Sequence, residues 1–78
     1  MNKMHNKIYL ILENIRPEVD FKSTTNFISE GYLDSFDIVS LVSSLDEEFN
    51  ISIDGTDIIP ENFETIDSIY SLVTKFYN

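Results

Sequence analysis

The segment that decides the fold spans residues 34–49 and reads DSFDIVSLVSSLDEEF. Its apolar residues recur at every third or fourth position, the spacing of one buried helical face: Ile38, Leu41, Val42, Leu45 and Phe49. Asp34 or Ser35 can cap the amino end of such a helix, and Asp37 falls in its first turn, where negative charge suits the helix dipole. Three consecutive acids, residues 46–48, crowd the last turn, where the dipole disfavours anions. That placement indicates a purpose other than helix stability.

Two further helices are expected, one on each side of this segment. Residues 3–16 carry apolar side chains at helical spacing until Pro17, which ends the helix because the residue before a proline is pushed out of the α region. Residues 66–77 show the same pattern after Thr65, a good capping residue. The inward positions expected in these two helices are Ile8, Ile11, Leu12 and Ile15, then Ile66, Ile69, Leu72, Val73 and Phe76.

The connections between the helices are of two kinds. Residues 17–34 have no sustained period and contain Gly31, so they predict a long loop. Four apolar residues should pin this loop across the helices: Phe21, Phe27, Ile28 and Leu33. Residues 51–53 are expected to be extended, and a short helix is expected within residues 57–63, limited to a turn or so by Pro60. The fold class is therefore all-α: a small four-helix bundle of three longer helices and one short one, forming a single domain over residues 1–78.

The charge of the chain is strongly negative and unevenly distributed. The formal net charge is −9, and residues 23–74 contain no Lys or Arg against eleven Asp and Glu. Such a surface repels nucleic acid and anionic lipid and attracts a basic protein partner. An acidic surface that only keeps a small protein in solution is the alternative. With no apolar run near the ~20 residues of a membrane span and no signal-peptide pattern, we expect a monomeric cytoplasmic protein without membrane contacts.

The sequence offers no catalytic or metal-binding set of its own. It contains no cysteine, which excludes disulfides and thiolate metal sites. The single histidine, His5, has no nearby partner in the sequence and is expected to be a solvated side chain on the first helix. A histidine-based catalytic triad or a site with several histidines cannot be built from this chain alone.

Residues 31–37, GYLDSFD, end the long loop and open the central helix. This segment resembles the phosphopantetheine attachment site of acyl carrier proteins, whose hallmark is Asp-Ser-Leu at the amino end of the second helix. The resemblance covers nearly the whole chain and is strongest over residues 27–72. The further matches are the apolar pair Phe27 and Ile28, the acidic helix end at residues 46–49, Ile53, and the pair Thr65 and Ile66.

The resemblance implies a function for Ser35. A phosphopantetheinyl transferase would move a 4′-phosphopantetheine arm from coenzyme A to its hydroxyl, with Asp34 as part of the motif, and the thiol of the arm would carry acyl or aminoacyl groups as thioesters. The chain would then be a carrier and not an enzyme. The first position of a helix suits this role, because the free N–H groups and the positive end of the dipole tolerate a phosphate.

The resemblance also implies partners with basic docking patches: the transferase, an acyl- or aminoacyl-activating ligase and other acyl-handling enzymes. The acids expected to meet them are Asp34, Asp37, Asp46, Glu47 and Glu48. Phe36 and Val39 fall off the buried face beside Ser35, so we expect an apolar docking contact there. The alternative is that Phe36 folds back against the loop as part of the core.

Four departures from the common fatty-acid pattern bear on the cargo. Phe36 replaces the usual leucine, Ser40 stands where glutamate is frequent, and Ser43 where methionine is frequent. Residues 54–64 are longer than the usual segment before the last helix, and the run Pro60–Phe63 resembles freestanding carriers of special pathways, including those that carry amino acids. These differences favour a dedicated carrier over a housekeeping fatty-acid carrier. An unmodified acidic helical adaptor, with Ser35 as a simple cap, is the alternative from a different class.

Overall fold

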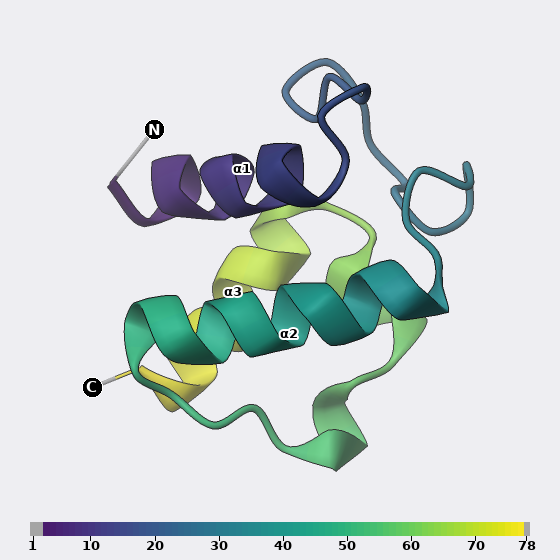
Figure 1. Cartoon of the computed structure of the whole chain (residues 1–78). Helices are drawn as coiled ribbons and strands as arrows, with labels where there is room; N and C mark the ends of the chain where they lie inside the picture. The colour runs from purple at the N-terminus through teal and green to yellow at the C-terminus, as the bar shows by residue number, and fades with distance from the viewer. Residues whose placement is uncertain (1–2, 78) are drawn as a thin grey trace.

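The computed structural model describes residues 3–77 and consists of helices and loops (Figure 1). The three α-helices are α1 (Lys3–Ile15), α2 (Ser35–Phe49) and α3 (Ile66–Phe76), and two 3-10 helices, η1 (Gly55–Asp57) and η2 (Pro60–Phe63), lie between α2 and α3. Residues 3–77 contain no strand, so the all-α prediction is confirmed. None of these helices is long and apolar enough to cross a membrane.

The short fourth helix is present as 3-10 turns and not as an α-helix. Pro60 occupies the first turn of η2, where its missing N–H does no harm, and the helix ends at Phe63. The preceding turn, η1, is capped by the Asp54 carboxylate, which accepts a hydrogen bond from the Thr56 N–H at 3.0 Å. Residues 51–54 are neither helix nor turn, and the backbone of Asp54 is extended, with φ −69° and ψ 138°.

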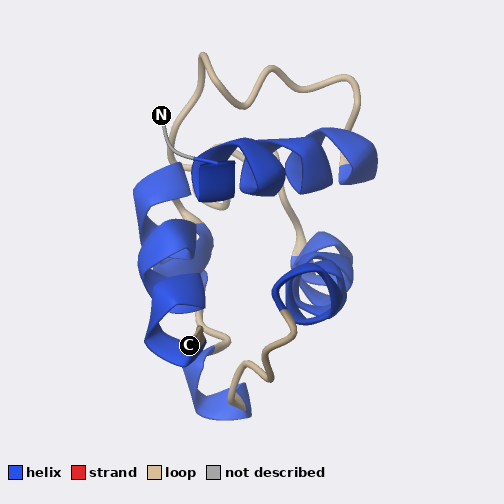
Figure 2. Ribbon diagram, turned by 90° about the vertical axis from the view of Figure 1, so that its left-hand side faces the viewer, coloured by secondary structure: helices blue, strands red, loops and turns tan. Residues whose placement is uncertain are grey.

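The core lies between α1 and the other helices. α1 packs against both α2 and α3, and η2 packs against α3. Figure 2 shows α1 across the top of the molecule with the other helices below it. The predicted inner faces are largely confirmed, although Ile38, Val42 and several flanking residues are only partly buried. The buried residues are Ile8, Tyr9, Leu12, Phe21, Phe27, Leu33, Leu41, Leu45, Phe49, Ile53, Phe63, Ile69, Leu72 and Val73.

Buried aromatic side chains anchor the long loop before α2 in the core, as expected. Phe21 and Phe27 are buried and meet edge to face, with ring centroids 5.1 Å apart. The Phe27 N–H donates to the Glu64 backbone carbonyl at 2.8 Å, and the Glu64 carboxylate accepts from the N–H groups of Ile28 and Ser29 at 2.9 and 3.0 Å. The loop is thus tied to the turn before α3, which fixes the point from which α2 starts.

The expectation for His5 was wrong. Its side chain is 16% exposed, and its ring stacks on that of Tyr70 with centroids 4.3 Å apart and an interplanar angle of 16°. The Nε2 atom lies 3.4 Å from the Asp67 carboxylate. Both partners lie on α3, more than sixty residues away in the sequence, so only the packing of α1 on α3 brings them to His5.

The arrangement of the helices places one end of α2 apart from the chain ends. In Figure 1 the beginning of α1 and the end of α3 lie on the left, whereas the beginning of α2 lies on the right. The beginning of α2, where the exposed Ser35 stands, therefore lies away from the beginning of α1 and the end of α3.

Candidate functional site

The amino end of α2 is closed by a reciprocal pair of carboxylates. Asp34 is the capping residue: its Oδ1 accepts from the Asp37 N–H at 3.0 Å, and the Asp37 Oδ2 accepts from the Asp34 N–H at 3.0 Å. This is a capping box, in which two otherwise unsatisfied N–H groups are bonded. The open choice between Asp34 and Ser35 as the cap is therefore resolved in favour of Asp34.

Because Asp34 takes the cap, the Ser35 hydroxyl is not used by the fold. Ser35 is the first residue of α2 and is exposed. Within residues 3–77 its Oγ makes no hydrogen bond that would have to be broken before a reaction. The surrounding N–H groups of the first helical turn and the positive end of the dipole also favour a phosphate at this position.

Arg16, directly after α1, binds both acids of the capping box. Its Nε donates to Asp37 Oδ2 at 2.8 Å, and its Nη2 lies 2.7 Å from the same oxygen and 3.2 Å from Asp34 Oδ2. Burial acts to raise the pKa of Asp37, but the bonds from Arg16 and the Asp34 N–H and the charge of Arg16 outweigh it, so the pKa of Asp37 lies below its usual value. Asp37 is therefore a charged structural residue, and only 13% of its side chain is exposed.

An apolar surface surrounds Ser35. Phe36 is 85% exposed and Val39 is 68% exposed, so Phe36 does not fold back into the core. Ile58 and Ile59, between the two 3-10 helices, are also exposed and line a hollow together with Ser35. This open hollow of about 280 Å³ is lined by Ser35, Ile38, Val39, Ile58, Ile59 and Pro60.

The remaining predicted acids lie at the far end of α2, about 18 Å from Ser35 at 1.5 Å per residue. Asp46 is committed to the fold, since its Oδ1 accepts from the Ile53 N–H at 3.0 Å. Glu48 lies 3.3 Å from the Lys7 ammonium group, and Glu47 is exposed. Two of these three acids therefore stabilise the fold through contacts outside α2: Asp46 with Ile53 and Glu48 with Lys7.

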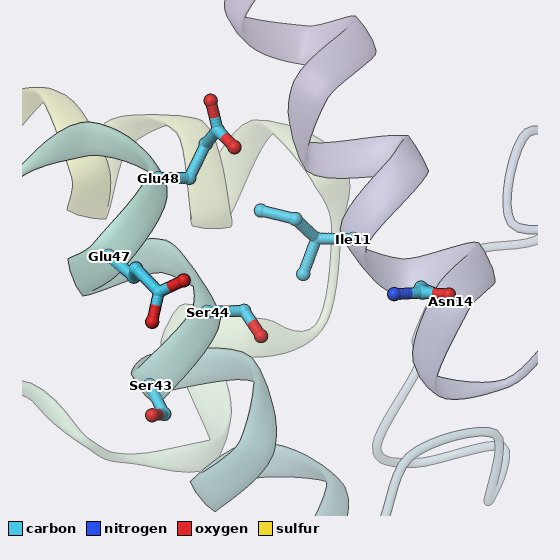
Figure 3. Close-up of a pocket in the computed structure, with 6 residues that line it drawn as sticks. All are labelled: Ile11, Asn14, Ser43, Ser44, Glu47 and Glu48. Atoms are coloured by element: carbon cyan, nitrogen blue, oxygen red, sulfur yellow. The ribbon is translucent and has the colours of Figure 1, made fainter.

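A second hollow, of about 410 Å³, opens between α1 and α2 at this far end. Figure 3 shows that Glu47, Glu48 and two serines of α2 face Ile11 and Asn14 of α1 across it. The lining residues are Ile11, Asn14, Ser43, Ser44, Glu47 and Glu48. Within residues 3–77, no hydrogen bond joins either serine of this hollow to Glu47 or Glu48, so it holds no serine activated by a neighbouring carboxylate.

These features define a small helical domain that presents one free serine hydroxyl at the start of its second helix. The phosphopantetheine attachment site family matches residues 10–73, and the chain belongs to this family of carrier domains. It is also similar to an acyl carrier protein of Buchnera aphidicola subsp. Baizongia pistaciae (strain Bp), with 32% identity over 78 residues that cover 97% of each chain. No solved structure gave a significant match.

A covalently attached 4′-phosphopantetheine is accordingly the cofactor of this carrier. The residues at the start of α2 fit the group, because an unbonded, exposed hydroxyl stands beside an apolar hollow and ahead of free helical N–H groups. When bound, the group supplies a thiol that carries acyl groups as thioesters. A set of three or more His, Asp or Glu side chains able to hold a metal ion does not occur within residues 3–77.

Sequence reasoning missed three residues of this site. Arg16 carried a signal, as one of only five bases in the chain and the last residue before Pro17, but its partners are far away in the sequence. Ile58 and Ile59 were placed in a short helix with no assigned face. They lie between the two 3-10 helices and in neither of them, so no helical period predicts the exposure of these two side chains.

Proposed function

We propose that Ser35 is the residue to which the phosphopantetheine arm is attached. The observation that supports this assignment is the free, exposed hydroxyl at the first position of α2, left unused because Asp34 caps the helix. In the transfer, a bond forms between Ser35 Oγ and a phosphorus of coenzyme A as the pyrophosphate P–O bond breaks. Adenosine 3′,5′-bisphosphate leaves, and the hydroxyl proton passes to a base of the phosphopantetheinyl transferase.

The chain itself acts as a substrate and shuttle and not as an enzyme. It has no cysteine, and its one histidine is packed between α1 and α3, away from the start of α2. The nucleophile in later steps is the thiol of the arm, so no protein base is needed at Ser35 after loading. A cytoplasmic location and a monomeric state remain part of this proposal.

The docking surface for partner enzymes is centred on Phe36 and Val39. Exposed apolar residues next to a modification site suit an apolar contact surrounded by polar contacts. Among the acids predicted to meet partners, Glu47 is the most available to a basic side chain. Asp37 and Asp46 already accept hydrogen bonds from other residues of the chain. Partners with an apolar recess and Lys or Arg at its edge fit this surface.

We further propose a dedicated pathway, with an acyl or aminoacyl cargo, over the general fatty-acid role. Phe36 in the motif, serines at positions 40 and 43, and the segment 54–64 folded as two 3-10 turns support this choice. A housekeeping fatty-acid carrier is the alternative. The two can be separated by purifying the protein from its own cells and weighing the species that hydroxylamine releases from the thioester.

The attachment is tested by intact mass after incubation with coenzyme A and a broad-specificity transferase. The wild-type chain should gain the mass of one phosphopantetheine group. Ser35→Ala should gain nothing, while Ser40→Ala, an exposed serine further along the same helix, should be modified like the wild type. An unchanged wild-type mass, or modification of Ser35→Ala, would reject the assignment and leave an unmodified acidic adaptor as the better description.

A further inference from the structure

Arg16 links the end of α1 to the start of α2, where Ser35 stands. It follows the last residue of α1, and its own N–H still donates to the Leu12 carbonyl at 2.9 Å, so its backbone position is set by the helix. From there the guanidinium reaches Asp37 at 2.7 and 2.8 Å and Asp34 at 3.2 Å. Among residues 3–77 it is the one base in ion-pair contact with the start of α2.

The start of α2 has two neighbouring residues able to cap it. Aspartate and serine are both preferred capping residues. If Asp34 caps, the helix begins at Ser35 and the serine hydroxyl stays free. If Ser35 capped instead, the helix would begin one residue later, and its oxygen would be engaged by a backbone N–H of the first turn.

The charges near the cap decide between these two arrangements. The Asp34 cap brings two carboxylates together in one capping box, and like charges at such close range repel each other. A guanidinium held across both carboxylates offsets this repulsion and adds directional, charge-assisted hydrogen bonds. A serine cap would need no such cation.

We propose that Arg16 is a positioning residue for arm attachment, which holds Asp34 in the capping position and thereby keeps the Ser35 hydroxyl free. This inference rests on Ser35 being the attachment residue. Arg16 acts through Asp34 and Asp37 and does not touch the reacting atoms.

The chain contains a matched control for its removal. Lys7 also lies on α1 and also pairs with an acid of α2, Glu48, at 3.3 Å, but at the far end of that helix. Arg16→Gln and Lys7→Gln therefore change the net charge by the same single unit, and each removes the contact of a base with the acids at one end of α2: Asp34 and Asp37 for Arg16, Glu48 for Lys7. Only Arg16→Gln disturbs the cap beside Ser35.

The experiment measures the kcat and KM of a phosphopantetheinyl transferase for each apo-protein, with folding checked by circular dichroism at the assay temperature. For Arg16→Gln we expect a kcat at least about fivefold lower, because a misplaced nucleophile loses its attack geometry. The KM should stay the same or fall, since losing a positive charge does not weaken attraction to a basic partner. Lys7→Gln should keep the wild-type kcat, and Arg16→Lys should recover part of the loss.

Each outcome bears on a separate claim. If the wild type is not modified, the assignment of Ser35 fails before Arg16 is tested. If the wild type is modified and Arg16→Gln has the kcat of Lys7→Gln, the positioning role is overturned, even if its melting temperature falls. If Arg16→Gln does not fold, Arg16→Lys is the deciding variant. A lysine ammonium group cannot bond both carboxylates as the planar guanidinium of Arg16 does, so its kcat should be lower than that of the wild type. A kcat equal to that of the wild type would overturn the proposal.

Discussion

The hydroxyl of Ser35 is free because a neighbouring residue performs the structural task that serine often performs. Asp34 caps α2, Asp37 completes the capping box, and Arg16 holds both. Three charged residues that could each be described as surface charges thus have a local structural role. Phe36, by contrast, has no structural role of this kind, since 85% of the residue is exposed to solvent.

We predict that Phe36→Ala impairs docking and not folding. An exposed aromatic side chain contributes little to the core, so the melting temperature should change by no more than about 4 °C, in line with the small effects of surface substitutions. If Phe36 enters an apolar recess of the partner, truncation should raise the transferase KM by about tenfold, within the range of interface hot spots. Steady-state kinetics with apo-protein as the varied substrate would measure the change.

The matched control for Phe36 is Leu10→Ala. Leu10 is 65% exposed, but it lies on α1 and not beside Ser35. Its truncation should leave the KM unchanged. Equal effects of the two substitutions would contradict a docking role specific to Phe36.

At the scale of elements, the turn that leads into α2 requires a glycine. Gly31 has φ +80°, in the left-handed region, whereas Gly55 has no positive φ, and an added Cβ would meet nothing within 4 Å at either position. Gly31→Ala should therefore destabilise the protein by about 1 kcal/mol through backbone strain alone. Gly55→Ala should be neutral or stabilising by up to about 1 kcal/mol, because it restricts the unfolded chain.

Thermal unfolding of both variants tests this difference. The melting temperature of Gly31→Ala should fall by about 4–8 °C for a domain of this size. A Gly31→Ala variant as stable as Gly55→Ala would show that the backbone at position 31 relaxes out of the left-handed region.

The sequence predicted the elements well where periodicity is strong. The expected helix 3–16 is observed as Lys3–Ile15, the central helix as Ser35–Phe49 and the helix 66–77 as Ile66–Phe76. Contacts between distant residues could not be predicted in the same way. The pairing of Arg16 with Asp37 and the stacking of His5 on Tyr70 depend on how the helices are packed, which no local pattern encodes.

The contact between the long loop and the turn before α3 should make the fold sensitive to acid. Bonds from the Ser29 hydroxyl and from the N–H groups of Ser29 and Ile28 hold the pKa of Glu64 below its usual value. A carboxyl group with a lowered folded-state pKa stabilises the fold above its unfolded-state pKa, and this contribution is lost as the pH falls through the folded-state pKa. Stability should thus decrease between about pH 5 and pH 2.

Glu64→Gln tests the source of this sensitivity. The amide cannot titrate and cannot accept all three bonds as the carboxylate does, so the variant should melt several degrees lower at pH 7 and lose less stability on acidification. Glu61→Gln, at an exposed position of η2, is the control and should keep the wild-type pH profile. If Glu64→Gln has the same pH dependence as the wild type, other carboxyl groups govern acid unfolding.

On the scale of the whole molecule, the net charge of −9 is spread over 78 residues with few compensating bases. Within residues 3–77, ion pairs of Lys or Arg reduce the repulsion at three places: Arg16 at the start of α2, Lys7 at its end, and Lys75 with Asp57 at 2.9 Å. The acids outside these pairs, including Glu47 and Glu61, still repel their neighbours. This excess of negative charge attracts basic partners, and it also destabilises the folded state through repulsion.

We predict that the melting temperature rises with ionic strength. Between about 10 mM and 0.5 M NaCl the screening length falls from about 30 Å to a few Å, which removes most of the repulsion between exposed charges. Screening also weakens these ion pairs, but exposed pairs contribute little, so the release of repulsion should dominate. Glu61→Lys should melt above the wild type at low salt and converge with it at high salt, because the difference between them is electrostatic. A flat response of the wild type, or a gap between the two proteins that persists at 0.5 M NaCl, would show that charge repulsion does not limit the stability of this carrier.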